Sequence, residues 1–330
     1  MAEATYSFVI PVFNEEPVLG ELHRRLDSMV GELGGPSEFV FVDDGSDDGS
    51  AEEILRLREL DPRVKLVSLS RNFGHQVAIS AGLDFATGQA IVIMDADLQD
   101  PPEVVPELVE RWKEGYEVVY AVREVRPGDP RWRRRAIRLA YRVLSRWSDT
   151  ELPPDAGDFR LVDRRVADIV RNMRESSRYL RGMFAWVGFR QTGVAYERPE
   201  RFAGESKYPL PKLVALAVDG LTGFSAAPLR LMLSFGFAIA ALSFLAGLTA
   251  AVLKITGGLS VPGWASLIVV LTFFTGVQLI ILGTIGLYVG RIFEQSRGRP
   301  LYLVDQAEGF GAAGPESGSP GQTLMADRND

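Results

Sequence analysis

The chain has 330 residues, enough for one large domain or two smaller ones. It contains no cysteine, which excludes disulfide bonds and thiolate metal sites. Its formal net charge of −7 argues against a nucleic-acid-binding protein.

Short apolar runs alternate with amphipathic segments in the first third of the chain. The apolar runs predict strands at Tyr6–Val12, Glu38–Val42, Val64–Leu69, Ala90–Met94 and Glu117–Ala121. The segments between them predict helices at about 14–33, Ala51–Leu60, Gln76–Ala86 and Pro102–Glu114. Strands that alternate with helices of about 10–15 residues are typical of βαβ units, so we expect an α/β fold with a mostly parallel sheet.

A polar loop follows the end of each of these strands. The loops contain Asn14-Glu15, Asp43-Asp44, Arg71-Asn72, Asp95-Ala96-Asp97 and Arg123. The carboxyl ends of parallel strands meet at one edge of a sheet, which is where α/β folds bind ligands. The shared position of these loops therefore predicts a binding site at that edge.

Asp95-Ala96-Asp97 carries two carboxylates one residue apart at the end of a buried strand. Burying two like charges together is costly unless a cation lies between them. Carboxylate ligands suit Mg²⁺ or Mn²⁺ shared with a substrate phosphate. The alternative is that Asp97 or Asp100 only caps the helix that begins near Pro101.

Other polar residues at the predicted edge could bind a nucleotide. Asp44 could accept hydrogen bonds from a base or a ribose hydroxyl, although Asp, Gly and Ser are also common turn residues. Arg123, Arg201 and Lys207 could hold phosphates, or could be solvated surface charges.

Three further residues carry weaker signals. Asp158 lies in a predicted loop between helices, where it could cap a helix or pair with Arg160. His23 and His75 have no third ligand at a suitable spacing, and we interpret them as surface residues.

The last third of the chain is apolar. Leu231–Leu253 and Ile255–Gly290 contain no charged residue, and a membrane-spanning helix needs about 20 apolar residues. We predict two spans, at about 229–253 and 264–290. Positive charges lie at the start of the first span, at Arg230, and after the second, at Arg291, Arg297 and Arg299, and only Lys254 lies between the spans. The positive-inside rule then places both termini in the cytoplasm of a multi-pass inner-membrane protein. The start of the chain has no signal-peptide pattern, which agrees with that topology.

Two amphipathic segments precede the first span. Residues 131–147 are basic, with apolar residues at helical spacing and tryptophans at both ends. This pattern fits either a helix packed on the domain or an interfacial helix on anionic lipid, and the neighbouring spans favour the second. Residues 209–228 form a second juxtamembrane stretch of this kind.

The set of motifs resembles the family 2 inverting glycosyltransferases of GT-A fold. Within that family it is most similar to polyprenyl-phosphate glycosyltransferases, such as bactoprenol glucosyltransferases and dolichyl-phosphate mannose synthases. The motifs are Pro11-Val12-Phe13-Asn14-Glu15, Val42-Asp43-Asp44-Gly45-Ser46, Ser70-Arg71-Asn72-Phe73-Gly74, Asp95 to Pro102, Gly157-Asp158-Phe159-Arg160 and Gly204-Glu205-Ser206-Lys207.

The resemblance implies roles for individual residues. The sugar nucleotide would be bound by Pro11, Phe13, Glu15, Val42, Asp44, Asp95, Ala96, Asp97 and Arg123. Mg²⁺ or Mn²⁺ would be held by Asp95, Asp97 and Gln99. The acceptor phosphate would meet Arg201, Lys207, Arg131 and Arg135. Asp158 matches a position proposed as the general base, and Asp97 and Asp158 would be the catalytic carboxylates.

The resemblance also implies a domain organisation. Residues 1–208 would form a cytoplasmic GT-A (Rossmann-like) catalytic domain, 209–228 a juxtamembrane segment, 229–290 the two spans, and 291–330 a cytoplasmic tail, disordered from about 308.

Glycines at 276, 283, 286 and 290 would allow close helix packing in a dimer or tetramer, although glycine is also simply tolerated in membrane helices.

The implied reaction moves a sugar from a UDP-sugar to polyprenyl (undecaprenyl) phosphate. Glucose is the first choice, with formamido-arabinose, galactose or mannose from GDP-mannose as alternatives. A processive polysaccharide synthase would need a Q-x-x-R-W segment and more spans, which this chain lacks. A non-catalytic sensor of sugar nucleotides is the third reading, and it predicts that a carboxylate or phosphate-binding residue is missing.

Overall fold

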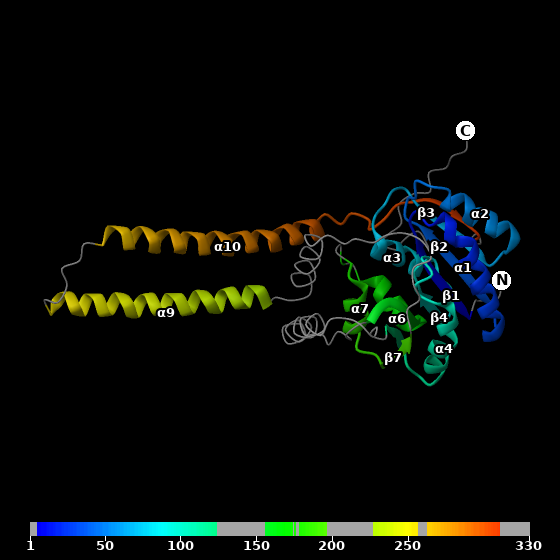
Figure 1. Ribbon diagram of the computed structural model, residues 1–330, viewed down its shortest axis with the longest axis horizontal. Helices are drawn as coiled ribbons and strands as arrows, with labels where there is room; N and C mark the ends of the chain where they lie inside the picture. Colours follow the sequence, from blue (N-terminus) through cyan, green and yellow to red (C-terminus); the bar gives the residue numbers. More distant parts are fainter. Residues whose placement is uncertain are drawn as a thin grey trace, which may run out of the picture. The chain divides into compact units, whose positions relative to one another are not determined.

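The computed structural model describes residues 5–123, 156–173, 175, 178–196, 227–256 and 263–310. The chain divides into two compact units (Figure 1). The second unit includes Tyr208–Gly298, and the first unit resumes at Arg299. The basic segment 131–147 and the juxtamembrane stretch up to residue 226 lie outside the described residues, so their predicted roles stay predictions.

The first unit is built on an eight-stranded sheet with the strand order β7-β5-β6-β4-β1-β2-β3-β8. The strands are β1 (Tyr6–Val12), β2 (Ser37–Asp43), β3 (Val64–Leu69), β4 (Ala90–Ile93), β5 (Val118–Arg123), β6 (Ala156–Asp163), β7 (Gln191–Tyr196) and β8 (Val304–Glu308). Strands β6 and β8 pair antiparallel with their neighbours, and the other pairings are parallel. The predicted α/β fold with a mostly parallel sheet is confirmed.

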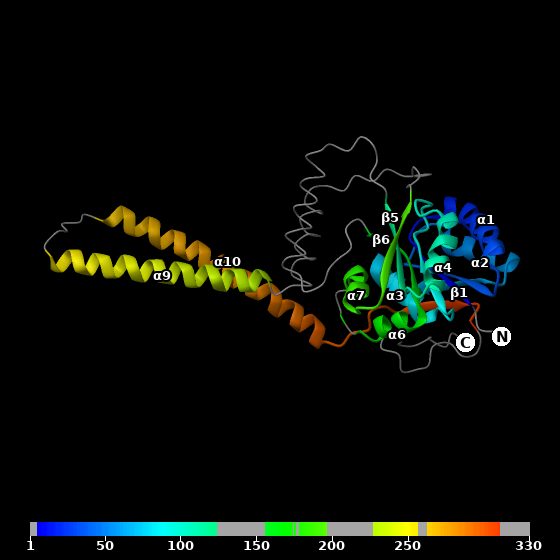
Figure 2. The ribbon, with the colours of Figure 1, turned by 90° about the horizontal axis from the view of Figure 1, so that it is seen from below.

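Helices cover both faces of this sheet (Figure 2). They are α1 (Glu16–Leu33), α2 (Ser50–Leu60), α3 (His75–Phe85), the 3₁₀ turn η1 (Pro102–Val104), α4 (Val105–Lys113), α6 (Arg164–Asn172) and α7 (Leu180–Trp186). The five strands and four helices predicted before residue 124 are present, with ends that move by a few residues. The largest change is at Pro102, where a 3₁₀ turn precedes α4.

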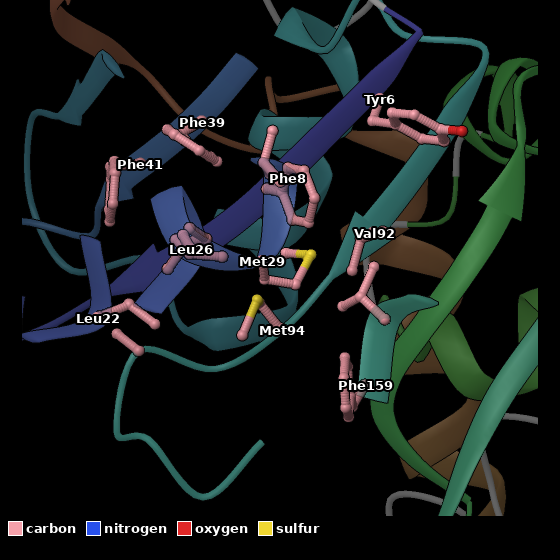
Figure 3. Packing of buried hydrophobic residues seen from close by; sticks show 14 of the residues in the cluster. Tyr6, Phe8, Leu22, Leu26, Met29, Phe39, Phe41, Val92, Met94 and Phe159 are labelled. Carbon is pink, nitrogen blue, oxygen red and sulfur yellow. The ribbon is translucent and has the colours of Figure 1, made fainter. Parts of the chain in front are cut away.

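Alternate residues of the central strands pack against different helices. Phe8 and Ile10 of β1 join one cluster with α1, α2 and α4, whereas Val9 joins a second with α3, α6 and α7. Figure 3 shows the first cluster, where Phe8 and Phe39 lie near Leu26 and Met29. Because side chains of a strand point alternately to its two faces, strands buried on both faces are mostly apolar, as these are, with Ser7, Glu38 and Asp43 as buried polar exceptions.

Residues after the apolar helices return to the first unit. Strand β8 pairs antiparallel with the edge strand β3, and Tyr302 is fully buried and donates a hydrogen bond to Asp84 Oδ2 at 2.7 Å. We expected a tail from residue 291, so this strand was not predicted. Its sequence, Val304-Asp-Gln-Ala-Glu308, has little apolar character because it covers a sheet edge rather than filling the core.

The second unit contains two long helices, α9 (Ala227–Ile255) and α10 (Trp264–Ser296). Apolar side chains such as Phe237 and Phe244 are exposed on α9, and Leu271 and Phe293 are exposed on α10. The hydroxyl groups of Thr249, Thr275 and Thr284 donate to carbonyl groups one turn earlier, which satisfies them without water.

The membrane prediction is supported only for part of this unit. In the described part of the chain, one stretch, Phe273–Ser296, is long and apolar enough to cross a membrane by length and composition, and Ser234–Leu245 is a shorter apolar stretch. Two complete spans therefore stay a prediction.

Candidate active site

The loops that follow β1, β2 and β3 are joined at the predicted edge of the sheet. Asn14 Oδ1 accepts a hydrogen bond from the backbone N–H of Asp47 at 2.8 Å, and the N–H of Asn14 donates to Ser46 Oγ at 3.0 Å. The N–H of Glu15 donates to Ser50 Oγ at 3.0 Å. These bonds fix the Asp-Gly-Ser turn against the start of α1.

Asp44 connects the second and third of these loops. Its carboxylate accepts hydrogen bonds from the backbone N–H groups of Phe73, at 2.7 Å, and Gly74, at 2.9 Å. Burial raises the pKa of Asp44, and these two bonds act in the opposite direction. The structure therefore shows Asp44 holding the loop 71–74, a role that the motif did not reveal.

The remaining residues predicted to bind the nucleoside lie in or just after β1 and β2. Pro11 and Val42 are paired in register on β1 and β2 and are buried. Phe13 follows β1 and is 42 % exposed, which leaves its ring accessible for stacking on a base. Glu15 is half-buried beside it.

Asp95 and Asp97 follow β4 at the same edge. In the described part of the chain, Asp95 Oδ1 is buried without a hydrogen-bond partner. Burial raises the pKa of Asp95 to about 7, and the negative charge of Asp100 adds to this effect. Asp97 Oδ1 accepts the backbone N–H of Gln99 at 3.1 Å, while Ala96 and Gln99 are buried.

This loop fits a divalent cation shared with a substrate. Among the described residues, no three His, Asp or Glu side chains are grouped as metal ligands. Mg²⁺ and Mn²⁺ at nucleotide sites use one or two carboxylates and take their other ligands from phosphates and water. The unsatisfied Asp95 Oδ1, with Asp97 and the Gln99 amide in the same loop, matches that donor set.

Asp158 lies on β6 and not in a loop between helices, so that expectation was wrong. Strand β6 was missed because the buried Arg160, which lies 5.0 Å from the Phe184 ring, interrupts the apolar pattern. Arg160 donates to the backbone carbonyls of Asp158 and Gly157, so it is not the partner of the Asp158 carboxylate.

Arg181 is that partner. Its Nε donates to Asp158 Oδ1 at 2.8 Å and a terminal nitrogen donates to Oδ2 at 3.0 Å, and Gln76 Nε2 donates to Oδ2 at 3.1 Å. Burial alone would raise the pKa of Asp158, but its bonds with His75 and Arg181 outweigh burial and hold that pKa far below its usual range. Asp158 is therefore a firmly ionised carboxylate and a weak proton acceptor.

His75 begins α3 between the two acidic sites. Its Nε2 lies 3.4 Å from Asp95 Oδ1 and 3.5 Å from Asp158 Oδ2. Burial would lower the pKa of His75, but its interactions with Asp158 and Asp95 raise it. The His75 side chain is 43 % exposed, as predicted for a surface residue, but its contacts with the two acidic residues were not predicted, and its position just after the third polar loop is the signal that could have indicated them.

Arg123 ends β5 on the other side of Asp95. Its Nε donates to the Tyr196 hydroxyl at 3.2 Å, and a terminal nitrogen lies 3.9 Å from Asp100 Oδ1. The structure thus brings Arg123 close to Asp100, in the loop that also contains Asp95 and Asp97, and against Gly157, which precedes Asp158. The predicted phosphate-binding residues Arg131, Arg135, Arg201 and Lys207 lie outside the described residues.

Comparison with known proteins shows the family of the chain. Residues 7–170 match the family described as Glycosyl transferase family 2. A glycosyltransferase of Bacillus subtilis, YkcC, is 47 % identical over 305 residues, which are 92 % of this chain and 94 % of that protein. The chain belongs to glycosyl transferase family 2. It is therefore a glycosyltransferase.

Other relatives of this family 2 enzyme have more specific names. A bactoprenol glucosyl transferase of Shigella phage SfX is 39 % identical over 298 residues, covering 90 % of this chain and 98 % of that one. Among solved structures, glucosyl-3-phosphoglycerate synthase of Mycobacterium tuberculosis is 19 % identical, with a TM-score of 0.44, and the match covers 66 % of this chain and 78 % of that chain.

Proposed function

We propose that this enzyme transfers glucose from UDP-glucose to polyprenyl phosphate in the membrane and releases UDP. The observation that carries the proposal is the extent of the match to the phage bactoprenol glucosyl transferase, which covers 90 % of this chain. A match of that length must extend beyond the sheet into the apolar helices. The likeness therefore includes the part of the chain suited to a lipid acceptor as well as the nucleotide-binding half.

The proposed reaction is a direct displacement with inversion. A phosphate oxygen of the lipid forms a bond to the anomeric carbon, and the bond from that carbon to the β-phosphate oxygen of UDP breaks. A phosphate monoester is largely ionised at neutral pH because its second pKa is about 6. It therefore needs no base, which agrees with the lowered pKa of Asp158. We assign Asp158 the role of orienting the sugar or the acceptor.

A divalent ion held by Asp95, Asp97 and Gln99 would stabilise the negative charge that develops on the departing UDP. On the protein side, Arg123 would donate to the same diphosphate, and an arginine fork suits phosphate oxygens. Phe13 and Asp44 would lie beside the nucleoside at the opposite end of the edge. Arg131, Arg135, Arg201 and Lys207 remain our candidates for the acceptor phosphate.

The proposed location is the inner membrane, with spans at about 229–253 and 264–290 and both termini in the cytoplasm. The exposed apolar side chains of α9 and α10 and the apolar stretch Phe273–Ser296 support a membrane location. The active-site edge would then act on a lipid phosphate at the cytoplasmic surface.

A donor panel tests the proposed function. Detergent-purified enzyme is mixed with polyprenyl phosphate, Mn²⁺ and, in separate reactions, UDP-glucose, UDP-galactose, a UDP-formamido-arabinose or GDP-mannose. Mass spectrometry of the lipid fraction should show one hexose added from UDP-glucose. Product from another donor alone would replace glucose by that sugar, long polymer would favour a processive synthase, and no product with any donor would favour a sensor.

Variants of the paired carboxylates test the cation. Asp97→Asn should reduce turnover by at least about 100-fold, because charge stabilisation at a leaving group typically supplies several kcal/mol. Asp168→Asn removes an exposed carboxylate from α6 and serves as the matched control. Full activity of Asp97→Asn after chelation of divalent ions would contradict the proposed metal role.

A further inference from the structure

Asp100 is a buried carboxylate that the proposed chemistry does not use. It is 1 % exposed and lies in the loop after β4, where its Oδ2 accepts the backbone N–H of Asp95 at 3.3 Å. Its Oδ1 accepts the hydroxyl of Tyr196 at 3.0 Å. A carboxylate buried to this extent is costly unless its oxygens are bonded. Asp100 therefore connects the metal-site loop to the end of β7.

The Tyr196 hydroxyl is bonded to Arg123 as well as to Asp100. Its ring is 5 % exposed and packs edge-on against Phe159, with 5.7 Å between ring centroids. A tyrosine hydroxyl has one proton to donate, and an arginine can only donate. Because Arg123 Nε donates to this hydroxyl at 3.2 Å, the single proton of Tyr196 is directed to Asp100. Burial and the charge of Asp100 raise the pKa of Tyr196 to about 12, which keeps that proton in place.

Gly157 fixes the guanidinium of Arg123 from a second direction. A Cβ atom at Gly157 would lie 3.2 Å from a terminal nitrogen of Arg123 and 3.6 Å from its Cζ. The guanidinium thus lies against the bare backbone of β6, next to Asp158. With Nε bonded to Tyr196 and a terminal nitrogen 3.9 Å from Asp100 Oδ1, the guanidinium is restrained, and its terminal nitrogens can still donate to a ligand. Such preorganisation makes binding of a phosphate cheaper, because the arginine does not have to be ordered on binding.

We propose that Tyr196 and Asp100 are positioning residues that hold Arg123 in the orientation in which it binds the diphosphate of the sugar nucleotide. This inference rests on the proposed function, since Arg123 can act in this way only if the donor carries a diphosphate. The inference deepens that function: Tyr196, the last residue of β7, would connect the loop proposed to hold the metal to Arg123, which is proposed to bind the diphosphate.

The test is Tyr196→Phe in the full-length enzyme, which removes the hydroxyl and keeps the ring packed on Phe159. The dissociation constants of UDP and of uridine are measured by calorimetry in the presence of Mn²⁺. We expect UDP to bind about 10-fold to 100-fold more weakly, the usual effect of losing a hydrogen bond to a charged group. Uridine, which has no phosphate, should bind as it does to the wild type. Tyr120→Phe on the neighbouring strand β5 is the matched control and should change neither constant.

A double-mutant cycle separates positioning from a general structural role. In an Arg123→Ala background, Tyr196→Phe should have no further effect on UDP binding, because the residue it positions is gone. Equal weakening of UDP and uridine, or the same effect of Tyr196→Phe with and without Arg123, would overturn the positioning role. Wild-type enzyme that binds UDP but adds no glucose to the lipid would contradict the proposed function alone, and wild-type enzyme that does not bind UDP would overturn both.

Discussion

The two halves of the active-site edge are held together by different kinds of interaction. On the β1–β3 side, backbone groups and short polar side chains connect the loops, as in the bonds from Phe73 and Gly74 to Asp44. On the β4–β7 side, charged side chains from distant segments form the connections, and Asp158 and Arg181 are the strongest example. Turns thus preform the side proposed to bind the nucleotide, whereas ionic contacts assemble the side where transfer is proposed.

This difference changes what a substitution should cost. A hydrogen bond between neutral groups of two loops, such as the Asp47 N–H with Asn14 Oδ1, contributes about 0.5–1.5 kcal/mol, and one to the Asp44 carboxylate about 1.5–3 kcal/mol. Removing one partner of a buried ion pair costs more, about 3–5 kcal/mol, because the other charge is left without compensation. We therefore expect the larger effects on the β4–β7 side.

The largest effect is expected for Arg181→Met. This substitution removes the bidentate ion pair of Asp158, whose side chain is 10 % exposed. Because Arg181 itself is 38 % exposed, solvent screening reduces the expected loss of unfolding free energy to about 2 kcal/mol. Turnover should fall by about 100-fold, since a misplaced carboxylate no longer orients the reacting groups.

Thermal unfolding and turnover of Arg181→Met are compared with those of Arg165→Met. Arg165 also forms ion pairs, with Glu117 and Asp163, but it is 68 % exposed and should change stability by less than about 0.5 kcal/mol. Similar behaviour of the two variants would contradict the larger contribution expected of the Arg181–Asp158 pair.

A smaller effect is expected on the β1–β3 side, for Gly45→Ala. Gly45 has a φ of 70°, and a Cβ atom there would lie 2.6 Å from the backbone carbonyl carbon of Arg71. The substitution must therefore displace the loop that Asp44 holds, in addition to the cost of about 1–2 kcal/mol for a left-handed alanine. UDP and uridine should both bind more weakly.

Gly34→Ala provides the control for Gly45→Ala. Gly34 has a φ of 65°, but a Cβ atom there would meet no atom within 4 Å. Alanine at Gly34 also strains the backbone, where ψ is 146°, but it displaces no loop, so nucleoside binding should be unchanged. If Gly34→Ala weakened uridine binding as much as Gly45→Ala does, the loop contact would have no role of its own.

The same contrast explains what the sequence could predict. Strands β1–β5 and helices α1–α4 follow from local apolar patterns, and the polar loops at their ends follow from chain order. The partners on the other side are set by tertiary packing: Tyr196 and Asp100 are separated by 96 residues, and Gln76 and Asp158 by 82. No local pattern marks such pairs, so Arg181, Gln76 and Tyr196 were missed, although Asp158 was identified from its motif.

The smallest effect is expected for Tyr302→Phe, which tests the contact on the β1–β3 side between α3 and the segment after α10. The Tyr302 hydroxyl donates to Asp84, and Arg171 Nε donates to the other carboxylate oxygen at 3.2 Å, so one bond would remain. The loss of unfolding free energy should be about 1 kcal/mol. Chemical denaturation measures it, with Tyr116→Phe, whose half-buried ring lies 4.8 Å from the Arg190 guanidinium, as the control. UDP binding should not change, because hydrogen bonds among the loops after β1, β2 and β3 hold the side proposed to bind the nucleotide. Weaker UDP binding in Tyr302→Phe would mean that β8 also shapes the site.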